Sequence, residues 1–145
     1  MNKVYILIGI PCSGKSTFSA TLDLPIISCD NIRQELFGKD YQHNFEDERR
    51  VWDVFRYKLT LQNSSFIIDN TNCRLKYIKE IIRCLNSEIE YKIELVYFDI
   101  PLWKANFRNI IRYFKIGKWI PFRIMKSMYN NYKNINRDEY KKCLV

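Results

Sequence analysis

The sequence predicts an α/β domain in three layers, with helices on both faces of a parallel sheet of about four strands. Short apolar runs alternate along the chain with stretches whose apolar residues recur at helical spacing, which is the pattern of parallel sheets covered by helices. A glycine-rich stretch follows the first apolar run directly, as it does in phosphate-binding α/β domains. Two helical stretches close the chain, and we expect them to form a C-terminal helical lid.

The first half of the predicted sheet comes from two apolar runs. Residues 4–8 form an unbroken apolar run that leads into the glycine-rich stretch, and residues 4–10 predict the first strand. A short helix is expected at residues 17–22. Residues 25–28 predict the second strand, and residues 31–37 predict the helix that follows it.

Two amphipathic helices and two strands complete the predicted core. Residues 46–62 and 74–85 each place four apolar side chains on one helical face, while residues 66–68 and 92–98 predict strands. The apolar helical positions are Val51, Val54, Phe55 and Leu59 in the first helix and Leu75, Ile78, Ile82 and Leu85 in the second.

The last third predicts helices at residues 102–113 and 121–134, and Pro101 suits the first turn of the earlier one. No repeat, linker or low-complexity segment interrupts the 145 residues, so we expect one domain over residues 1–145. No apolar run approaches the roughly 18 residues of a membrane span. The five cysteines and His43 lack the spacing of a zinc site, and we expect a cytoplasmic protein with reduced thiols.

The net charge of +8 is concentrated in the last third of the chain. Residues 101–145 contain eleven Lys or Arg against two Asp or Glu, interleaved with aromatic residues, whereas residues 1–100 are nearly balanced. A basic patch of this kind suits an acidic partner, above all nucleic acid. A solvated lysine-rich surface explains the charge equally well.

The glycine-rich stretch GIPCSGKS at residues 9–16 fits G-x-x-x-x-G-K-[ST] and lies between a predicted strand and a predicted helix. Gly9 and Gly14 allow backbone N–H groups to surround a phosphate, Lys15 reaches the β- and γ-phosphates of ATP, and the Ser16 hydroxyl takes a Mg²⁺ position. The chain has no N-K-x-D guanine motif. We therefore expect an ATP site formed by Gly9, Pro11, Cys12, Ser13, Gly14, Lys15, Ser16 and Thr17.

Carboxylates follow the second and third predicted strands, at the edge where ligands bind in open α/β sheets. Asp30 in SCDNIR could accept the proton of an acceptor hydroxyl, with Arg33 on the same side, or it could simply cap the helix. Asp69 in IIDNTN is placed as a metal-shell carboxylate would be. Asp99 is its rival, but Pro101 favours a helix-capping role for Asp99. Donors for substrate or phosphate are expected from Asn70, Thr71 and Asn72.

The last predicted cations are Arg108 and Arg112, which share one helical face at i and i+4. Arginines that close over a transferring phosphoryl group stabilise its charge. Gly117 and Pro121 predict a flexible lid segment between the last two helices. An exposed amphipathic helix bearing two arginines is the alternative interpretation.

Taken in order, these stretches resemble the kinase domain of phage-type 5′-hydroxyl polynucleotide kinase. GIPCSGKST looks like its ATP loop, SCDNIR its base-and-arginine segment, DNTN its third-strand motif, and YFDIP with FRNIIR its last strand and lid arginines. Cys12 stands where the family commonly has glycine, and the acid Asp69 lies one position earlier than in the phage member, where this chain has Asn70. No D-x-D-x-T segment of a 3′-phosphatase is present.

The resemblance implies that Lys15 and Ser16 bind ATP and Mg²⁺, Asp30 is the general base, Arg33 grips an acceptor phosphate, and Arg108 and Arg112 serve the ATP phosphates. We therefore expect ATP-dependent phosphorylation of DNA or RNA 5′-hydroxyl ends, with Asp30, Lys15 and Arg112 as catalytic residues. Two alternatives stay open. One is a kinase for a nucleoside, sugar or antibiotic on the same fold, and the other is a non-catalytic, nucleotide-dependent nucleic-acid-binding module.

Overall fold

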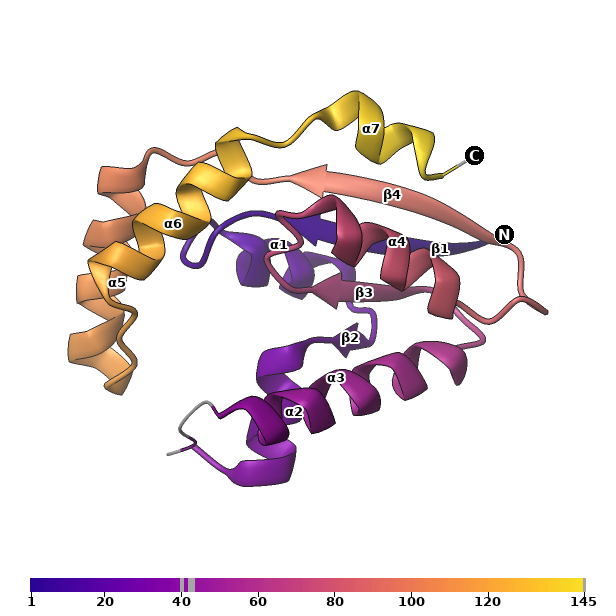
Figure 1. Ribbon diagram of the computed structural model, residues 1–145, viewed down its shortest axis with the longest axis horizontal. Coiled ribbons are helices and arrows are strands. Elements are labelled where there is room, and N and C mark those ends of the chain that lie inside the picture. Colours follow the sequence, from indigo (N-terminus) through magenta and orange to yellow (C-terminus); the bar gives the residue numbers. More distant parts are fainter. Residues whose placement is uncertain (40, 42–43, 145) are drawn as a thin grey trace.

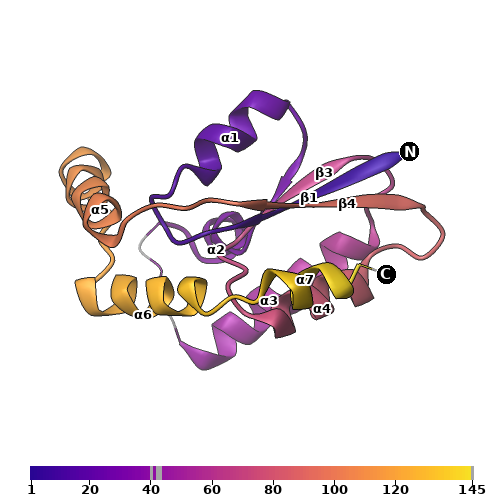
Figure 2. The ribbon, with the colours of Figure 1, turned by 90° about the horizontal axis from the view of Figure 1, so that it is seen from above.

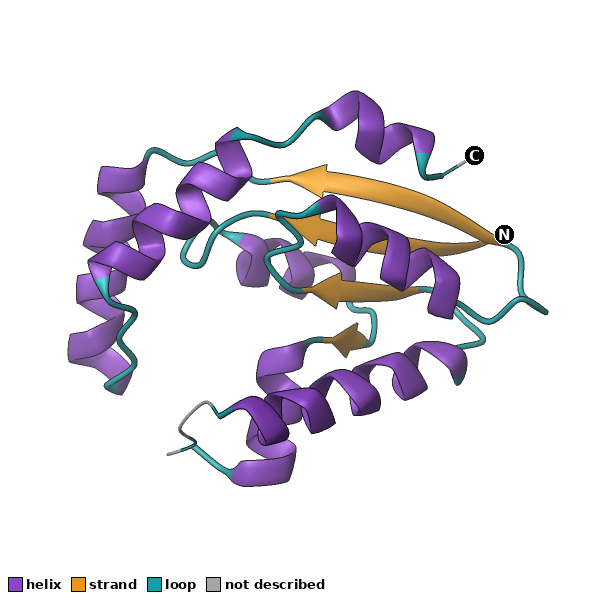
Figure 3. Cartoon of the chain, in the orientation of Figure 1, coloured by secondary structure: helices purple, strands orange, loops and turns teal. Residues whose placement is uncertain are grey.

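The computed structural model describes residues 1–39, 41 and 44–144, and Figure 1 shows them as one sheet flanked by helices. Strands and helices largely alternate along the chain (Figure 3). In order they are β1 (Asn2–Ile8), α1 (Lys15–Leu22), β2 (Ile26–Ile27), α2 (Cys29–Phe37), α3 (Phe45–Thr60), β3 (Phe66–Asp69), α4 (Leu75–Cys84), β4 (Tyr91–Tyr97), α5 (Leu102–Ile116), α6 (Phe122–Lys133) and α7 (Arg137–Lys142).

The sheet has the order β2-β3-β1-β4, and each neighbouring pair is parallel. Val4 of β1 lies opposite Phe66 on one side and Ile93 on the other, so the carboxyl ends of the strands share one edge. Figure 2 shows α1 on one face of the sheet and α3, α4 and α7 on the other. The predicted three-layer α/β/α fold is confirmed.

The core lies on the two central strands. Their side chains alternate between the two faces, and both faces are covered, so residues 4–8 of β1 and 66–68 of β3 are all apolar or aromatic. The fully buried apolar side chains include Val4, Ile6, Ile8, Phe66, Ile67 and Ile68 from the strands, with Val51, Phe55, Leu59, Ile78 and Ile81 from the helices.

Most element bounds differ from the sequence prediction by one to three residues, and two of these differences have a local reason. Helix α1 begins at Lys15, two residues early, because Gly14 adopts a left-handed φ of 104° as its N-cap. Helix α5 continues to Ile116 and ends at Gly117, which also adopts a left-handed φ of 71°.

Helix α7 was not predicted, and it docks on the sheet by side-chain bonds. Tyr140 is buried, and its hydroxyl donates to the carbonyl of Asn72 at 2.9 Å. Asp99, after β4, accepts bonds from the Tyr132 hydroxyl and from the Arg137 guanidinium, and these bonds lower the pKa of the Asp99 carboxyl. Within the described residues, no helix is long and apolar enough to cross a membrane.

Candidate active site

The glycine-rich loop between β1 and α1 is tightly packed against the end of the sheet. A Cβ at Gly9 would lie 2.8 Å from the Ser13 Oγ and 2.9 Å from the Phe98 Cβ, so only glycine fits there. Cys12 adopts a left-handed φ of 65°, a conformation that glycine adopts more easily. Cysteine at this position therefore carries some backbone strain that glycine would not.

Lys15 is the buried cation of this loop. Its Nζ donates to the carbonyls of Gly9 and Ile10, both at 2.9 Å. Burial lowers the pKa of Lys15, while the negative charges of Asp69 and Asp30 oppose that shift. The ammonium is therefore held by two loop carbonyls and lies within the electrostatic influence of Asp69 and Asp30.

Asp69 ends β3 beside the loop. Burial raises the pKa of the Asp69 carboxyl, and the charge of Lys15 and a hydrogen bond from Ser16 oppose that shift. The structure thus brings Asp69 together with Lys15 and Ser16, while Asp99 is engaged by Tyr132 and Arg137 instead. Of the two carboxylates compared in the sequence, Asp69 lies at the loop.

The three residues after Asp69 form hydrogen bonds with backbone groups of neighbouring elements. The Asn70 Oδ1 accepts from the backbone N–H of Cys29 at 2.9 Å, which fastens the start of α2 to β3. The Thr71 carbonyl accepts from the N–H of Gly9 at 3.0 Å. Asn72 is buried, and its Nδ2 donates to the carbonyl of Leu7 at 2.8 Å. These bonds join β3, α2 and the glycine-rich loop at one edge of the sheet.

Asp30 lies in the first turn of α2 with its side chain 86% exposed. It is not the helix cap, because the Ser28 Oγ takes that place and accepts from the N–H of Asn31 at 3.1 Å. The negative charge of Asp30 acts on both Lys15 and Asp69. An accessible carboxylate therefore lies beside the phosphate loop.

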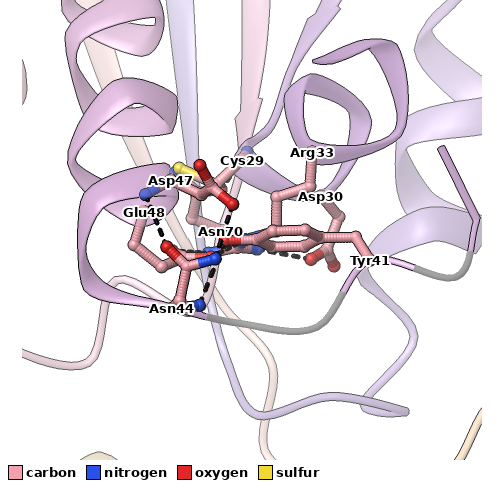
Figure 4. Close-up of polar contacts among 8 residues, drawn as sticks. All are labelled: Cys29, Asp30, Arg33, Tyr41, Asn44, Asp47, Glu48 and Asn70. Carbon is pink, nitrogen blue, oxygen red and sulfur yellow. Dashed lines mark hydrogen bonds and ion pairs between the residues drawn. The ribbon is translucent and has the colours of Figure 1, made fainter. Parts of the chain in front are cut away.

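Arg33 connects Asp30 to α3 (Figure 4). Its Nε and Nη2 donate to the two carboxylate oxygens of Glu48 at 2.8 and 2.9 Å, and its Nη1 donates to the Asp30 Oδ1 at 2.7 Å. Burial lowers the pKa of Arg33, but the bonds to Glu48 outweigh it and raise the pKa. A fork-to-fork pair fixes the plane of a guanidinium, so Glu48 orients Arg33 and, through it, Asp30.

The two arginines of α5 face the loop from the other side. The Arg108 Nη1 donates to the Cys12 carbonyl at 3.1 Å, and the Arg112 Nη1 lies 4.0 Å from the Cys12 Sγ. Both predicted cations are therefore brought to the glycine-rich loop from about a hundred residues away in the chain.

The segment expected to be a flexible lid is fastened at one point. Asn109 of α5 is fully buried; its Nδ2 donates to the carbonyl of Ile120 at 2.7 Å, and its Oδ1 accepts from the N–H of Ile120 at 3.3 Å. Sequence reasoning missed Asn109, Glu48 and Tyr140. Asn109 could have been noticed as an asparagine inside the apolar face of a predicted helix. Glu48 and Tyr140 have no such signal in the neighbouring sequence.

Among residues 1–39, 41 and 44–144, no group of three or more His, Cys, Asp and Glu side chains could hold a metal, and His43 lies outside these residues. The oxygens of Ser16 and Asp69 form a smaller set. Mg²⁺ in phosphoryl-transfer sites is bound by one or two protein oxygens together with substrate phosphates and water. This pair fits that chemistry.

A parallel sheet, a glycine-rich loop at its carboxyl edge and a buried lysine in that loop define a P-loop nucleotide-binding domain of the kinase type. Residues 4–134 match the AAA domain family, and the chain belongs to that family. The fold, the loop and the family together support phosphoryl transfer of the kinase type.

Similar proteins include the L-seryl-tRNA(Sec) kinase of Methanococcus maripaludis, which is 28% identical over 136 residues, or 88% of this chain and 51% of that protein. The chain thus spans about half the length of the curated relative it matches. A chain in the structure of the Pnkp1/Rnl/Hen1 RNA repair complex has a TM-score of 0.77 at 24% identity, covering 91% of this chain and 44% of that one. Another structure of the Pnkp1/Rnl/Hen1 complex has a TM-score of 0.61 at 26% identity, covering 74% and 39%.

Proposed function

We propose that this protein is an ATP- and Mg²⁺-dependent kinase that phosphorylates the 5′-hydroxyl end of a nucleic acid. The observation that carries the proposal is the position of Asp30: an exposed carboxylate, tied to Arg33, whose charge acts on the loop lysine. A base beside the γ-phosphate and open to solvent is what transfer to an incoming hydroxyl requires.

The nucleotide side consists of the loop and the α5 arginines. Two of the three Lys15 ammonium protons are donated to loop carbonyls, and the third can bind a γ-phosphate oxygen. Arg108 and Arg112 contact Cys12 within the loop, so small rotations of their side chains would bring them onto ATP phosphates. Ser16 and Asp69 would hold Mg²⁺, which neutralises phosphate charge when it is bound.

The acceptor side consists of Asp30 and Arg33. Asp30 accepts the proton of the 5′-hydroxyl as its oxygen bonds to the γ-phosphorus and the bond to the ADP oxygen breaks. The transferred group needs mainly alignment and charge stabilisation, so a weakly basic carboxylate is sufficient. Arg33 has N–H groups beyond those given to Glu48 and Asp30, and these can bind an acceptor phosphate.

Nucleic acid is favoured as the acceptor by charge and by similarity. Eleven Lys or Arg lie in residues 101–145, which form the α5–α7 side of the molecule. Two of the similar proteins carry RNA in their names, the tRNA kinase and the RNA repair complex. Both observations support a polynucleotide over a small acceptor.

The test is transfer of label from γ-labelled ATP, with Mg²⁺, to a short RNA and a short DNA that carry 5′-hydroxyl ends. The same strands with 5′-phosphates and the Lys15→Ala variant are the controls. Label on the 5′-hydroxyl strands alone, lost in the variant, is the expected result. Bound ATP with no labelled strand would overturn the proposal.

A second candidate acceptor is the serine hydroxyl of a seryl-tRNA, favoured by the match that covers 88% of this chain. Seryl-tRNA with a 5′-phosphate belongs in the same assay, because only its aminoacyl hydroxyl can then be labelled. Label that is lost on deacylation would assign this acceptor. A nucleoside, sugar or antibiotic acceptor would instead give labelled small molecule and unlabelled strands.

A further inference from the structure

The turn between α5 and α6 carries an exposed aromatic cluster that the proposed chemistry does not use. We call Tyr113, Phe114, Trp119 and Phe122 the aromatic turn; their exposed fractions are 50%, 80%, 42% and 47%. The rings contact one another edge to face, with centroids 6.0 Å apart for Tyr113 and Trp119 and 4.9 Å apart for Trp119 and Phe122. They are thus ordered against each other without being covered by the rest of the described chain.

The aromatic turn is held in shape by the backbone beneath it. Asn109 bonds both the N–H and the carbonyl of Ile120, the residue next to Trp119, and Gly117 ends α5 in a left-handed conformation. Surfaces that are ordered before binding lose less conformational entropy when a partner arrives. Four exposed rings on a fastened turn are therefore a preformed binding surface.

The charge around the aromatic turn selects the kind of partner. Lys115, Lys118 and Arg123 lie among the rings, are exposed, and have no carboxylate partner in the described part of the chain. Residues 101–136 contain no Asp or Glu at all, so two copies meeting at this face would bring like charges together. Aromatic rings interleaved with cations are the features by which proteins bind single-stranded nucleic acid, through base stacking and phosphate contacts.

We propose that the aromatic turn binds the body of a single-stranded nucleic acid whose 5′ end lies at Asp30. The inference rests on the proposed function, because the bound strand is its acceptor. Tyr113 directly follows Arg112, which contacts the phosphate loop, so the aromatic turn begins one residue beyond the nucleotide side of the site. A strand long enough to reach the rings gains stacking contacts that a very short acceptor lacks.

The test compares 5′-hydroxyl RNAs of 3 and 12 nucleotides as acceptors, and measures binding of a fluorescent 12-nucleotide RNA that already carries a 5′-phosphate. The variants are Trp119→Ala and Phe122→Ala. The matched control is Trp103→Ala, because Trp103 is also an exposed tryptophan but lies at the other end of α5.

We expect each variant of the aromatic turn to weaken binding of the 12-nucleotide RNA about tenfold and to raise its KM similarly, with kcat retained. Trp103→Ala should match the wild type. A Lys118→Gln variant should lower the slope of log affinity against log salt by about one.

The inference is overturned if the wild type has the same KM for the 3- and 12-nucleotide acceptors, or if both ring variants leave the 12-nucleotide affinity unchanged. Loss of binding to phosphatidylserine vesicles in Trp119→Ala, with RNA binding intact, would assign the surface to a membrane instead. If neither RNA is phosphorylated but 12-nucleotide binding still depends on Trp119, the proposed function fails and the binding surface stands.

Discussion

Arg33 and Arg56 are the centres of two side-chain clusters that are built alike. Each arginine donates Nη1 to an aspartate three residues earlier, Asp30 or Asp53, and Nε to a glutamate of the next helix. The α2 cluster consists of Asp30, Arg33 and Glu48. The Arg56 cluster consists of Asp53, Arg56 and Glu80.

Location separates the two clusters. The charge of Asp30 acts on Lys15 and Asp69 at the carboxyl edge of the sheet. The Arg56 cluster joins α3 to α4, two helices that cover one face of the sheet (Figure 2). An Asp–Arg–Glu arrangement therefore ties helices together in both places, and only its position beside the phosphate loop makes one of them a candidate for catalysis. Variants of the Arg56 cluster therefore serve as controls for variants of the cluster around Arg33.

The largest contrast is expected between Asp30→Asn and Asp53→Asn. Loss of a positioned general base lowers transfer by about 10²–10⁴-fold, and ATP binding should persist because Asp30 is not in the loop. Asp53→Asn should retain full activity. Steady-state rates with a 5′-hydroxyl oligonucleotide, and nucleotide titration of both variants, measure this contrast. Loss of ATP binding in Asp30→Asn would place Asp30 on the nucleotide side instead.

Distorting the loop beside the α2 cluster should have the next largest effect. Gly9→Ala puts a Cβ 2.8 Å from the Ser13 Oγ and 2.9 Å from the Phe98 Cβ. Overpacking of this kind costs about 1–3 kcal/mol, which we expect to appear as weaker ATP binding and a lower melting temperature. Nucleotide titration and thermal unfolding test it. An alanine variant with wild-type ATP affinity would show that the loop relaxes freely.

Exchanging the arginines for lysine keeps their charge and removes their planar fork. Arg33→Lys should raise the KM for oligonucleotide about tenfold and leave the KM for ATP unchanged, because the fork is what binds Glu48 and an acceptor phosphate together. Arg56→Lys should change neither constant. Equal oligonucleotide KM values in the two variants would remove Arg33 from the acceptor site.

The smallest effect concerns pH. The folded pKa of Lys15 lies below that of an ordinary lysine because of burial, and the Asp30 charge counteracts this lowering. Phosphate binds the protonated ammonium, so ATP affinity should fall as the pH rises through the lowered pKa. Removing the Asp30 charge should move this fall to a lower pH in Asp30→Asn, and Asp53→Asn should leave it in place. Nucleotide affinity measured stepwise at pH values below the ordinary lysine pKa of about 10.4 records the shift.

The sheet and the phosphate loop could be predicted from the sequence because both depend on patterns of neighbouring residues. Apolar runs of strand length and the spacing of Gly9, Gly14 and Lys15 are properties of neighbouring residues. The proximity of Asp69 to the loop followed from the rule that parallel strands end at one edge. That rule does not distinguish Asp30 as a base from Asp30 as the N-cap of the helix. In the structure Ser28, not Asp30, caps α2.

The remaining features depend on contacts between distant parts of the chain. Glu48 meets Arg33 only because α3 packs against α2, and no periodicity of either helix specifies that pairing. Helix α7 has six residues and one buried side chain, Tyr140, which is too little for a periodic pattern. The flexible segment expected around Gly117 was inferred from glycine and proline alone, and the bonds from Asn109 to Ile120 were invisible in that composition.

The docking of α7 bears on how this domain can be cut and fused in the laboratory. The family match ends at residue 134, but the Tyr140 hydroxyl bonds the Asn72 carbonyl, and Asn72 in turn bonds the Leu7 carbonyl just before the phosphate loop. A protein truncated to the matched residues would lose the bond from Tyr140 to Asn72 and expose the apolar core residues that Tyr140 covers. The packed core therefore extends past the family boundary, and we expect reporter tags to be tolerated best beyond α7.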